Sequence, residues 1–142
     1  MTLREPVTAE DFERYALLPE NAHKRLKLVE GHVIDAGLNW WSSVVNARLS
    51  SAVLDYLLNE NDIGWVTGPG CGYAVGGERY LPNMAYHCYE RFPKPTGEYY
   101  PPVAPTIAVE IIMGIPGEEA ILGVQLRHYL AAGSTVWIVR PY

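Results

Sequence analysis

The residues of this chain that could carry out chemistry are few and lie far apart in the sequence. Glu110 is the only charged residue in the apolar segment 106–113, and a carboxylate in such a place can bind a hard divalent cation such as Mg²⁺. Glu30 and Asp35 lie near a predicted turn at Gly31 and could supply further negative charge. The simpler interpretation of Glu110 is a charge at the edge of a sheet, paired with a Lys or an Arg.

Two histidines offer a second, softer kind of metal site. His87 has the same parity as Asn83 in the predicted strand 83–88, so both side chains are expected on one side of a sheet. Together with His32 and Glu110, His87 could bind a metal such as Zn²⁺. The alternative is that both histidines are ordinary surface or core residues, which is the commoner situation for isolated histidines.

The composition limits the classes of protein to which the chain can belong. It has 142 residues, of which 49% are hydrophobic, and this predicts one domain, residues 1–142, with a buried core. The net charge is -5 and the Lys and Arg residues are scattered, so a face that holds DNA tightly is not expected. No apolar run reaches the ~20 residues that span a bilayer. Cys71 and Cys88 are expected to be reduced thiols of a cytoplasmic protein.

Hydrophobic periodicity and turn signals predict helices alternating with strands. The predicted helices cover residues 8–18, 43–59 and 117–132, and the predicted strands cover residues 64–67, 71–75, 83–88, 106–113 and 136–139. Strand-like residues on both sides of Gly31 predict a β-hairpin. This order predicts an α/β or α+β fold, in which a mixed sheet has helices on both faces.

The same patterns predict which side chains face inward. The predicted core-facing residues of the two longer helices are Val44, Val45, Leu49, Ala52, Val53, Leu54 and Leu57, and then Ile121, Leu122, Leu126, Tyr129 and Leu130. The segment 106–113 is apolar on both faces, which is typical of a central strand, and the segment 136–139 is predicted to be a second buried strand.

Several segments, taken in order, resemble the Uma-type restriction endonuclease family of the PD-(D/E)XK nuclease superfamily. The segments that carry the resemblance are residues 8–12 (TAEDF), 26–31 (LKLVEG), 68–73 (GPGCGY), 81–85 (LPNMA), 107–111 (IAVEI), 129–133 (YLAAG) and 136–139 (VWIV). No single segment is specific, and the resemblance rests on their order and spacing from residue 8 to the C-terminus. It implies a restriction-endonuclease-like fold and a metal-dependent DNA phosphodiesterase.

The resemblance also implies which residues belong to the active site. In such sites an Asp after a Pro and a Glu on the next core strand hold one or two Mg²⁺ ions, and a Lys, here expected on the following helix, assists the reaction. These three positions fall on Asn83, which follows Pro82, on Glu110, and on Gln125, four residues before Tyr129. Glu110 alone keeps a residue that the family uses as a metal ligand. The alternatives are that Asn83 only starts a strand and that Gln125 is a solvated helix residue.

Further departures from the family pattern lie in the predicted hairpin. Lys27 stands where the family usually has a Glu, and His32 stands where an acid is expected after Gly31. Each lost carboxylate weakens a site for a hard cation, and Lys27 could repel Mg²⁺ from the same cleft. The resemblance therefore predicts a degenerate nuclease that cleaves weakly or not at all and that would need Mg²⁺ only if it were active.

Two other functions stay open, from different classes. One is a non-enzymatic binding or assembly module on a nuclease fold, and the other is an active nuclease that uses Glu30, Asp35 and Glu110. Relatives of the family usually continue beyond the position of Tyr142, so we expect a free sheet edge that pairs two copies into a homodimer. DNA is expected to be a weak partner at most.

Overall fold

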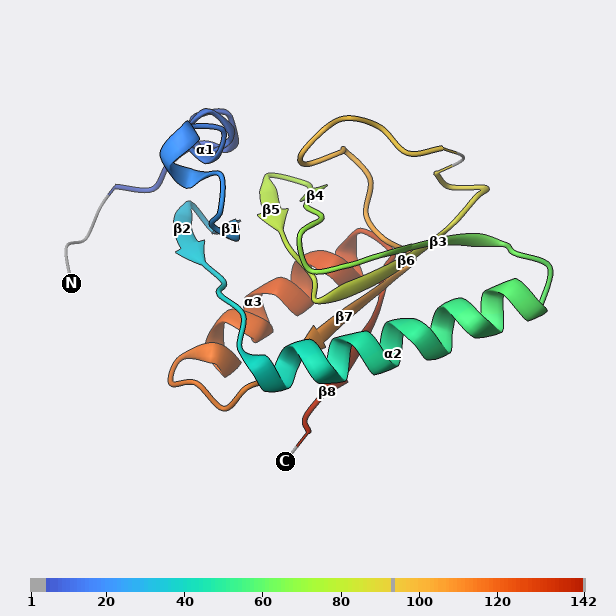
Figure 1. Ribbon diagram of the computed structural model, residues 1–142. Helices are drawn as coiled ribbons and strands as arrows, with labels where there is room; N and C mark the ends of the chain where they lie inside the picture. The colour runs from blue at the N-terminus through green and yellow to red at the C-terminus, as the bar shows by residue number, and fades with distance from the viewer. Residues whose placement is uncertain (1–4, 93, 142) are drawn as a thin grey trace.

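The computed structural model describes residues 5–92 and 94–141, which form two four-stranded sheets and three α-helices (Figure 1). Along the chain the elements are α1 (Ala9–Ala16), the short 3₁₀ helix η1 (Pro19–Asn21), β1 (Leu26–Val29), β2 (His32–Asp35), α2 (Trp40–Asn59), β3 (Gly64–Thr67), β4 (Tyr73–Val75), β5 (Glu78–Tyr80), β6 (Met84–Cys88), β7 (Ile107–Ile111), α3 (Glu118–Ala131) and β8 (Thr135–Val139). None of the described helices combines the length and the apolar character that crossing a bilayer requires.

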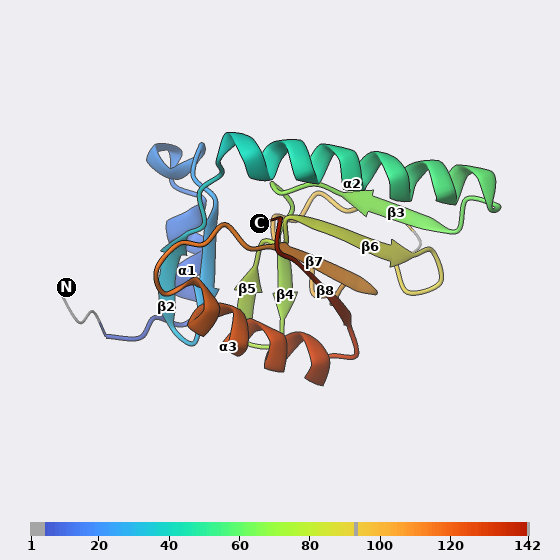
Figure 2. The ribbon, with the colours of Figure 1, turned by 90° about the horizontal axis from the view of Figure 1, so that it is seen from below.

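The mixed sheet has the strand order β3-β6-β7-β8. β7 pairs antiparallel with β6 and parallel with β8, and the parallel connection runs through α3. Ala108 and Val109 are neighbours in β7, so their side chains point to opposite faces, and both are 0% exposed. α2 and α3 cover these two faces (Figures 1 and 2). The prediction of an α+β fold with a central apolar strand between helices is confirmed.

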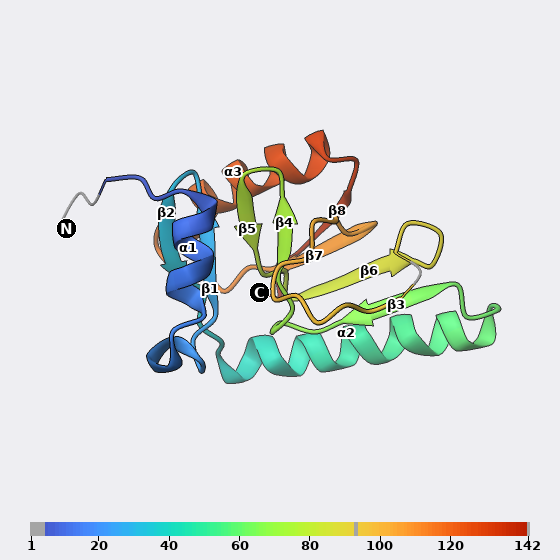
Figure 3. The same cartoon turned by 90° about the horizontal axis from the view of Figure 1, so that it is seen from above.

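A second sheet, antiparallel and with the order β2-β1-β5-β4, was not predicted. It forms because β5 inserts between the predicted hairpin and β4, pairing Leu28 with Arg79 on one side and Tyr73 with Tyr80 on the other. β5 has three residues, two of them charged, so its sequence carries no alternating pattern from which a strand could be predicted. Figure 3 shows α1 lying over the β1–β2 hairpin, where Phe12 packs against β1.

α2 begins earlier than predicted, and its buried face agrees only in part with the prediction. Asn39 caps it, because the Asn39 side chain accepts a hydrogen bond from the Ser42 amide and the Ser42 hydroxyl accepts one from the Asn39 amide. The buried residues of the helix are Ser42, Asn46 and Leu57. Leu54, predicted to face the core, is exposed, as is Ala52. Leu57 is buried as predicted and Leu49 and Val53 are half-buried, whereas periodicity missed Ser42 and Asn46 because they are polar.

Two predictions about the C-terminal elements were wrong. Leu130 is exposed, because the core side of α3 runs through Leu122, Gln125 and Tyr129. β8 is partly exposed rather than buried, because β7 is its only neighbour in the sheet. An apolar strand such as TVWIV does not by itself reveal whether it lies at the centre or at the edge of a sheet.

Replacing Gly31 by Ala should destabilise the protein more than replacing Gly76 by Ala. Both glycines have positive φ, at +80° and +59°, but a Cβ on Gly31 would lie 2.5 Å from the Cβ of Pro6, whereas a Cβ on Gly76 would meet nothing within 4 Å. We expect a loss in the free energy of unfolding of about 1 kcal/mol for Gly76→Ala and about 2–3 kcal/mol for Gly31→Ala. Urea denaturation measures both, and equal losses would show that the Pro6 contact does not constrain the turn.

Candidate functional site

The three positions predicted for an active site line one cavity of about 170 Å³. The cavity lies between the β1–β2 hairpin, the adjoining ends of β6 and β7, and the first half of α3. Asn83 lies directly opposite Glu110 when the pairing of Met84 with Val109 is continued by one residue, so both side chains face α3. Gln125 reaches the same cavity from that helix. The structure therefore brings together Asn83, Glu110 and Gln125.

Glu110 is a buried carboxyl group, 7% exposed, on the central strand β7. Its Oε1 atom accepts hydrogen bonds from Nε2 of Gln125 at 3.1 Å and from the hydroxyl of Tyr129 at 3.3 Å. Burial raises the pKa of Glu110 to about 7, and the positive charge of Lys27 is the largest of the effects that oppose this rise. The carboxyl group therefore changes its charge close to neutral pH.

Lys27, on the half-buried middle of β1, completes a chain of hydrogen bonds across the cavity. Its Nζ atom donates to Oε1 of Gln125 at 2.8 Å, while Nε2 of the same amide donates to Glu110. Burial lowers the pKa of the Lys27 ammonium group, and the charge of Glu110 is the main effect in the opposite direction. One amide thus connects a cation on one sheet with a carboxyl group on the other. We call Lys27, Gln125 and Glu110 the relay.

Asn83 is used to join strands. Its Oδ1 atom accepts a hydrogen bond from the amide of Ile111 at 2.9 Å, and its main-chain oxygen accepts one from Nδ2 of Asn46 at 2.6 Å. The carbonyl oxygen of the side chain therefore holds β7, and the Nδ2 amino group is a donor that carries no negative charge. An amino group donates hydrogen bonds and cannot bind a cation. An Asp at this position could bond to Ile111 with one oxygen and keep the other free.

Three further charged residues line the cavity: Arg25, Asp35 and Glu118. Arg25 donates to the main-chain oxygens of Pro69, Gly37 and Leu81, and so ties the start of β1 to three connecting segments. Burial lowers the pKa of its guanidinium group, and the charges of Glu110 and Asp35 oppose this. The sequence places Arg25 in a small basic cluster with Lys24 and Lys27, but Arg25 was not predicted to belong to the site, although it precedes β1 with the same parity as Lys27.

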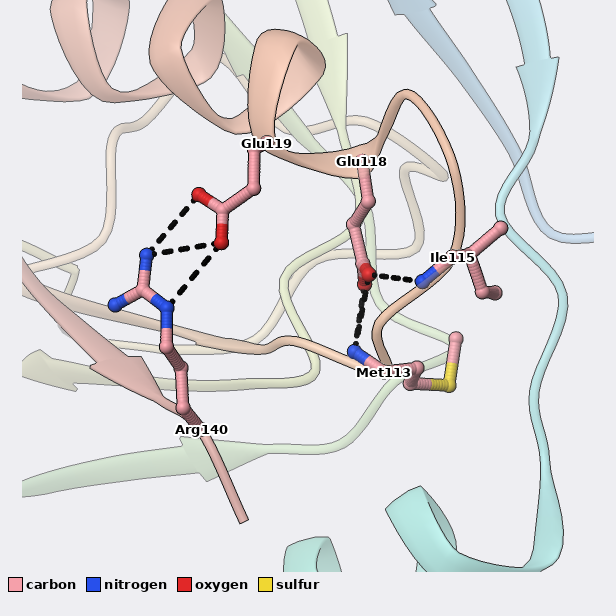
Figure 4. Close-up of polar contacts among 5 residues, drawn as sticks. All are labelled: Met113, Ile115, Glu118, Glu119 and Arg140. Carbon is pink, nitrogen blue, oxygen red and sulfur yellow. Dashed lines mark hydrogen bonds and ion pairs between the residues drawn. The ribbon is translucent and has the colours of Figure 1, made fainter. Parts of the chain in front are cut away.

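Glu118 closes the loop that leads into α3, and it too was missed from the sequence. Its carboxylate accepts hydrogen bonds from the amides of Met113, at 2.8 and 3.1 Å, and of Ile115, at 3.0 Å (Figure 4). The neighbouring Glu119 instead forms an exposed pair with Arg140 on the outside of the helix (Figure 4). The sequence did contain one signal that Glu118 has a structural role, because it is an acidic residue in the first turn of a predicted helix.

The other predicted metal sites are not assembled. Glu30 lies on the exposed hairpin turn, 3.7 Å from Arg127 and from His128, and does not line the cavity. His32 is exposed on β2, and His87 lines a different cavity. Among the residues that the structure describes, no group of three or more His, Cys, Asp or Glu side chains is placed to hold a metal ion.

Replacing Glu110 by Gln should remove one pH dependence of stability. The pKa of Glu110 is about 7 in the folded protein, against an ordinary value of 4.5, so the folded state binds more protons between these pH values. The free energy of unfolding should therefore fall as the pH rises from about 4.5 to about 7. The variant lacks this dependence. Its free energy of unfolding, measured relative to that of the wild type, should therefore rise by about 1–3 kcal/mol as the pH rises over this range.

Denaturant unfolding at several pH values measures this difference. Glu119→Gln is the matched control, because Glu119 is an exposed carboxylate outside the cavity. Curves for wild type and Glu110→Gln that run parallel from pH 4.5 to 7 would contradict a raised pKa at Glu110.

Comparisons with known proteins bear on the family and on the fold of the chain. The Uma2 family, described as "Putative restriction endonuclease", matches residues 9–142. A crystal structure of "a putative nuclease belonging to DUF820" from Anabaena variabilis superposes with a TM-score of 0.75 at 19% identity, over 96% of this chain and 75% of the other. No curated protein matches. The chain therefore shares the fold of that protein, and it belongs to the Uma2 family, whose description is "Putative restriction endonuclease".

Proposed function

We propose that this protein is a restriction-endonuclease-like protein whose cavity supplies its own cation and cleaves DNA poorly or not at all. One observation carries the proposal. Lys27 and Glu110 are bridged by Gln125 through hydrogen bonds of 2.8 and 3.1 Å, at the positions where the family resemblance implies a metal site. An ammonium group thus compensates the carboxylate that a divalent ion would otherwise neutralise.

The residues of the cavity do not fit Mg²⁺. This ion requires several oxygen ligands in a nearly octahedral arrangement. Oε1 of Glu110 already accepts two hydrogen bonds, and Oδ1 of Asn83 accepts one from the main chain. Lys27 adds repulsion, which for two unit charges 4 Å apart is about 4 kcal/mol near a protein surface and is larger for a divalent ion.

Positions 27 and 125 are in direct contact, and this links two of the departures from the family pattern. The resemblance implies an acid at position 27 and a Lys at position 125, whereas the chain has Lys27 and Gln125. The cavity therefore keeps one Lys, but the ammonium group comes from β1 instead of α3. The two substitutions form one coupled exchange of charge, which supports a pocket reorganised around an internal cation.

Nucleic acid is proposed only as a weak partner. The net charge is -5, so general electrostatic attraction to phosphates is unfavourable. Arg25 and Lys27, the two cations that line the cavity, are committed to main-chain oxygens and to Gln125. Cys71 and Cys88 are free thiols, in keeping with the cytoplasmic location that we propose.

Restoring the family residues should create a metal-dependent nuclease. The structure requires a triple variant, Lys27→Glu, Asn83→Asp and Gln125→Lys, because Gln125→Lys alone would bring a second ammonium group against Lys27. We expect the triple variant to bind Mn²⁺ in calorimetry and to nick plasmid DNA at least ~10²-fold faster than the wild type. Adding Glu110→Ala should abolish both gains.

The matched control is the double variant Asn83→Asp/Gln125→Lys, which keeps Lys27 and should gain much less. A triple variant that stays inert and metal-free would show that these residues are not the remains of an active site. Plasmid nicking by the wild type that is lost in Glu110→Ala would instead show that the cavity is active.

The alternative function, a non-enzymatic assembly module, is supported by exposed apolar surface. Trp40 is 79% exposed on α2, with Tyr56 and Leu58 also exposed, and β8 has an unpaired edge in the part of the chain described. We propose that two copies pair through this edge, as strands with free amides tend to do.

Light scattering should then give twice the mass of one chain. The main-chain groups of Thr135 and Val139 bond toward β7, so the amides of the alternate residues Val136 and Ile138 face the free edge. Ile138→Pro should therefore reduce the dimer while keeping the sheet. A wild-type mass equal to one chain at all concentrations would contradict the pairing.

A further inference from the structure

A second cavity, of about 370 Å³, lies at the opposite end of β6 from the relay. It is lined by β3, the start of β4, the end of β6 and residues 92, 95–99 and 101, which belong to the long yellow-to-orange loop beside β4 in Figure 1. The aromatic side chains that line it are Trp65, Tyr73, Phe92 and Tyr99. His87 follows Asn83 by four residues on β6, so the two cavities are about 13 Å apart along the strand.

His87 is the polar group of this cavity that nothing in the fold uses. It is 3% exposed, and neither ring nitrogen has a hydrogen-bond partner among the described residues. The ring packs edge-on against Tyr73, with centroids 5.7 Å apart, and tilted against Phe92, at 5.0 Å. Burial lowers the pKa of His87, so the imidazole is neutral at pH 7 and offers one N–H donor and one acceptor. Buried polar groups in folded proteins are normally paired.

The charge of the lining restricts what could pair with His87. Among the described residues that line this cavity there is no Lys or Arg, and Glu98 is the one acidic side chain. A phosphate or carboxylate group would therefore meet no cation. The cavity also contains a pair of hydroxyl groups, Thr67 and Tyr73, which are 2.6 Å apart and already bonded to each other. An uncharged ligand with its own donors and acceptors suits this lining.

We propose that this cavity binds an uncharged, planar heteroaromatic ring of the size of a nucleobase. The ring would stack on the aromatic wall, as bases do on aromatic side chains, and would hydrogen-bond to His87. A ligand that carries both a donor and an acceptor can pair with either tautomer of a neutral imidazole. The side chain of Phe92 must turn aside, while its main-chain oxygen stays bonded to Nε1 of Trp65 at 3.0 Å. This binding requires neither metal nor cleavage.

The test uses adenosine, guanosine, cytidine and thymidine, added to the full chain in buffer without divalent ions. At least one nucleoside should bind saturably in calorimetry and shift a ring nitrogen of His87 in ¹⁵N NMR. His87→Phe keeps an aromatic ring but removes both nitrogens, and it should weaken binding at least tenfold. His32→Phe, an exposed histidine outside the cavity, is the matched control and should bind normally.

The free protein gives a second readout. Because neither nitrogen of His87 has a partner, His87→Phe should keep or raise the melting temperature in the absence of ligand. A melting temperature lowered by several degrees in both His87→Phe and the smaller His87→Leu would show that the nitrogens are already bonded, to water or to protein, and would overturn the proposal. So would an absence of saturable binding by all four nucleosides. Either failure leaves the metal titrations of the relay variants unaffected, so the two proposals can fail separately.

Discussion

The relay of Lys27, Gln125 and Glu110 is the interaction on which the interpretation of this molecule depends. A carboxyl group on a central strand loses its hydration, and its ionised form is tolerated only where charge or hydrogen bonds compensate. Related nucleases are expected to provide that compensation with a metal ion. Here an ammonium group from β1 does so through an amide from α3. The partners lie 98 and 15 residues apart in sequence, so the contact joins both sheets to the helix.

The fold explains why this exchange is possible. β5 links the β1–β2 hairpin to β4 within one sheet, and Lys27 of β1 lines the same cavity as Glu110 of β7. Arg25 and Glu118 fix the two loops that border the same cavity by bonding to main-chain groups. These two charged side chains therefore stabilise the loops, and their hydrogen-bonding groups are not free for a ligand. The second cavity differs, because there the ring nitrogens of His87 have no hydrogen-bond partner in the part of the chain that the structure describes.

Much of the fold could be predicted from sequence, since the hairpin, the two longer helices and β7 carry strong local patterns. The meeting of Asn83, Glu110 and Gln125 was expected from the family resemblance, as was a charge from Lys27 near that cleft. The relay itself could not be predicted, because it depends on rotamers and on the packing of α3 against β1. β5, the polar face of α2 and the exposure of β8 were missed because tertiary contacts decide them.

The most direct test is a ¹³C NMR titration of the Glu110 carboxyl group in the wild type and in Lys27→Met. If Lys27 supplies the compensating charge, the pKa should lie near 7 in the wild type and rise further in the variant, because the largest effect that stabilises the ionised form is gone. A pKa that is the same in both proteins would contradict the account, because Lys27 would then not be the cation of this cavity.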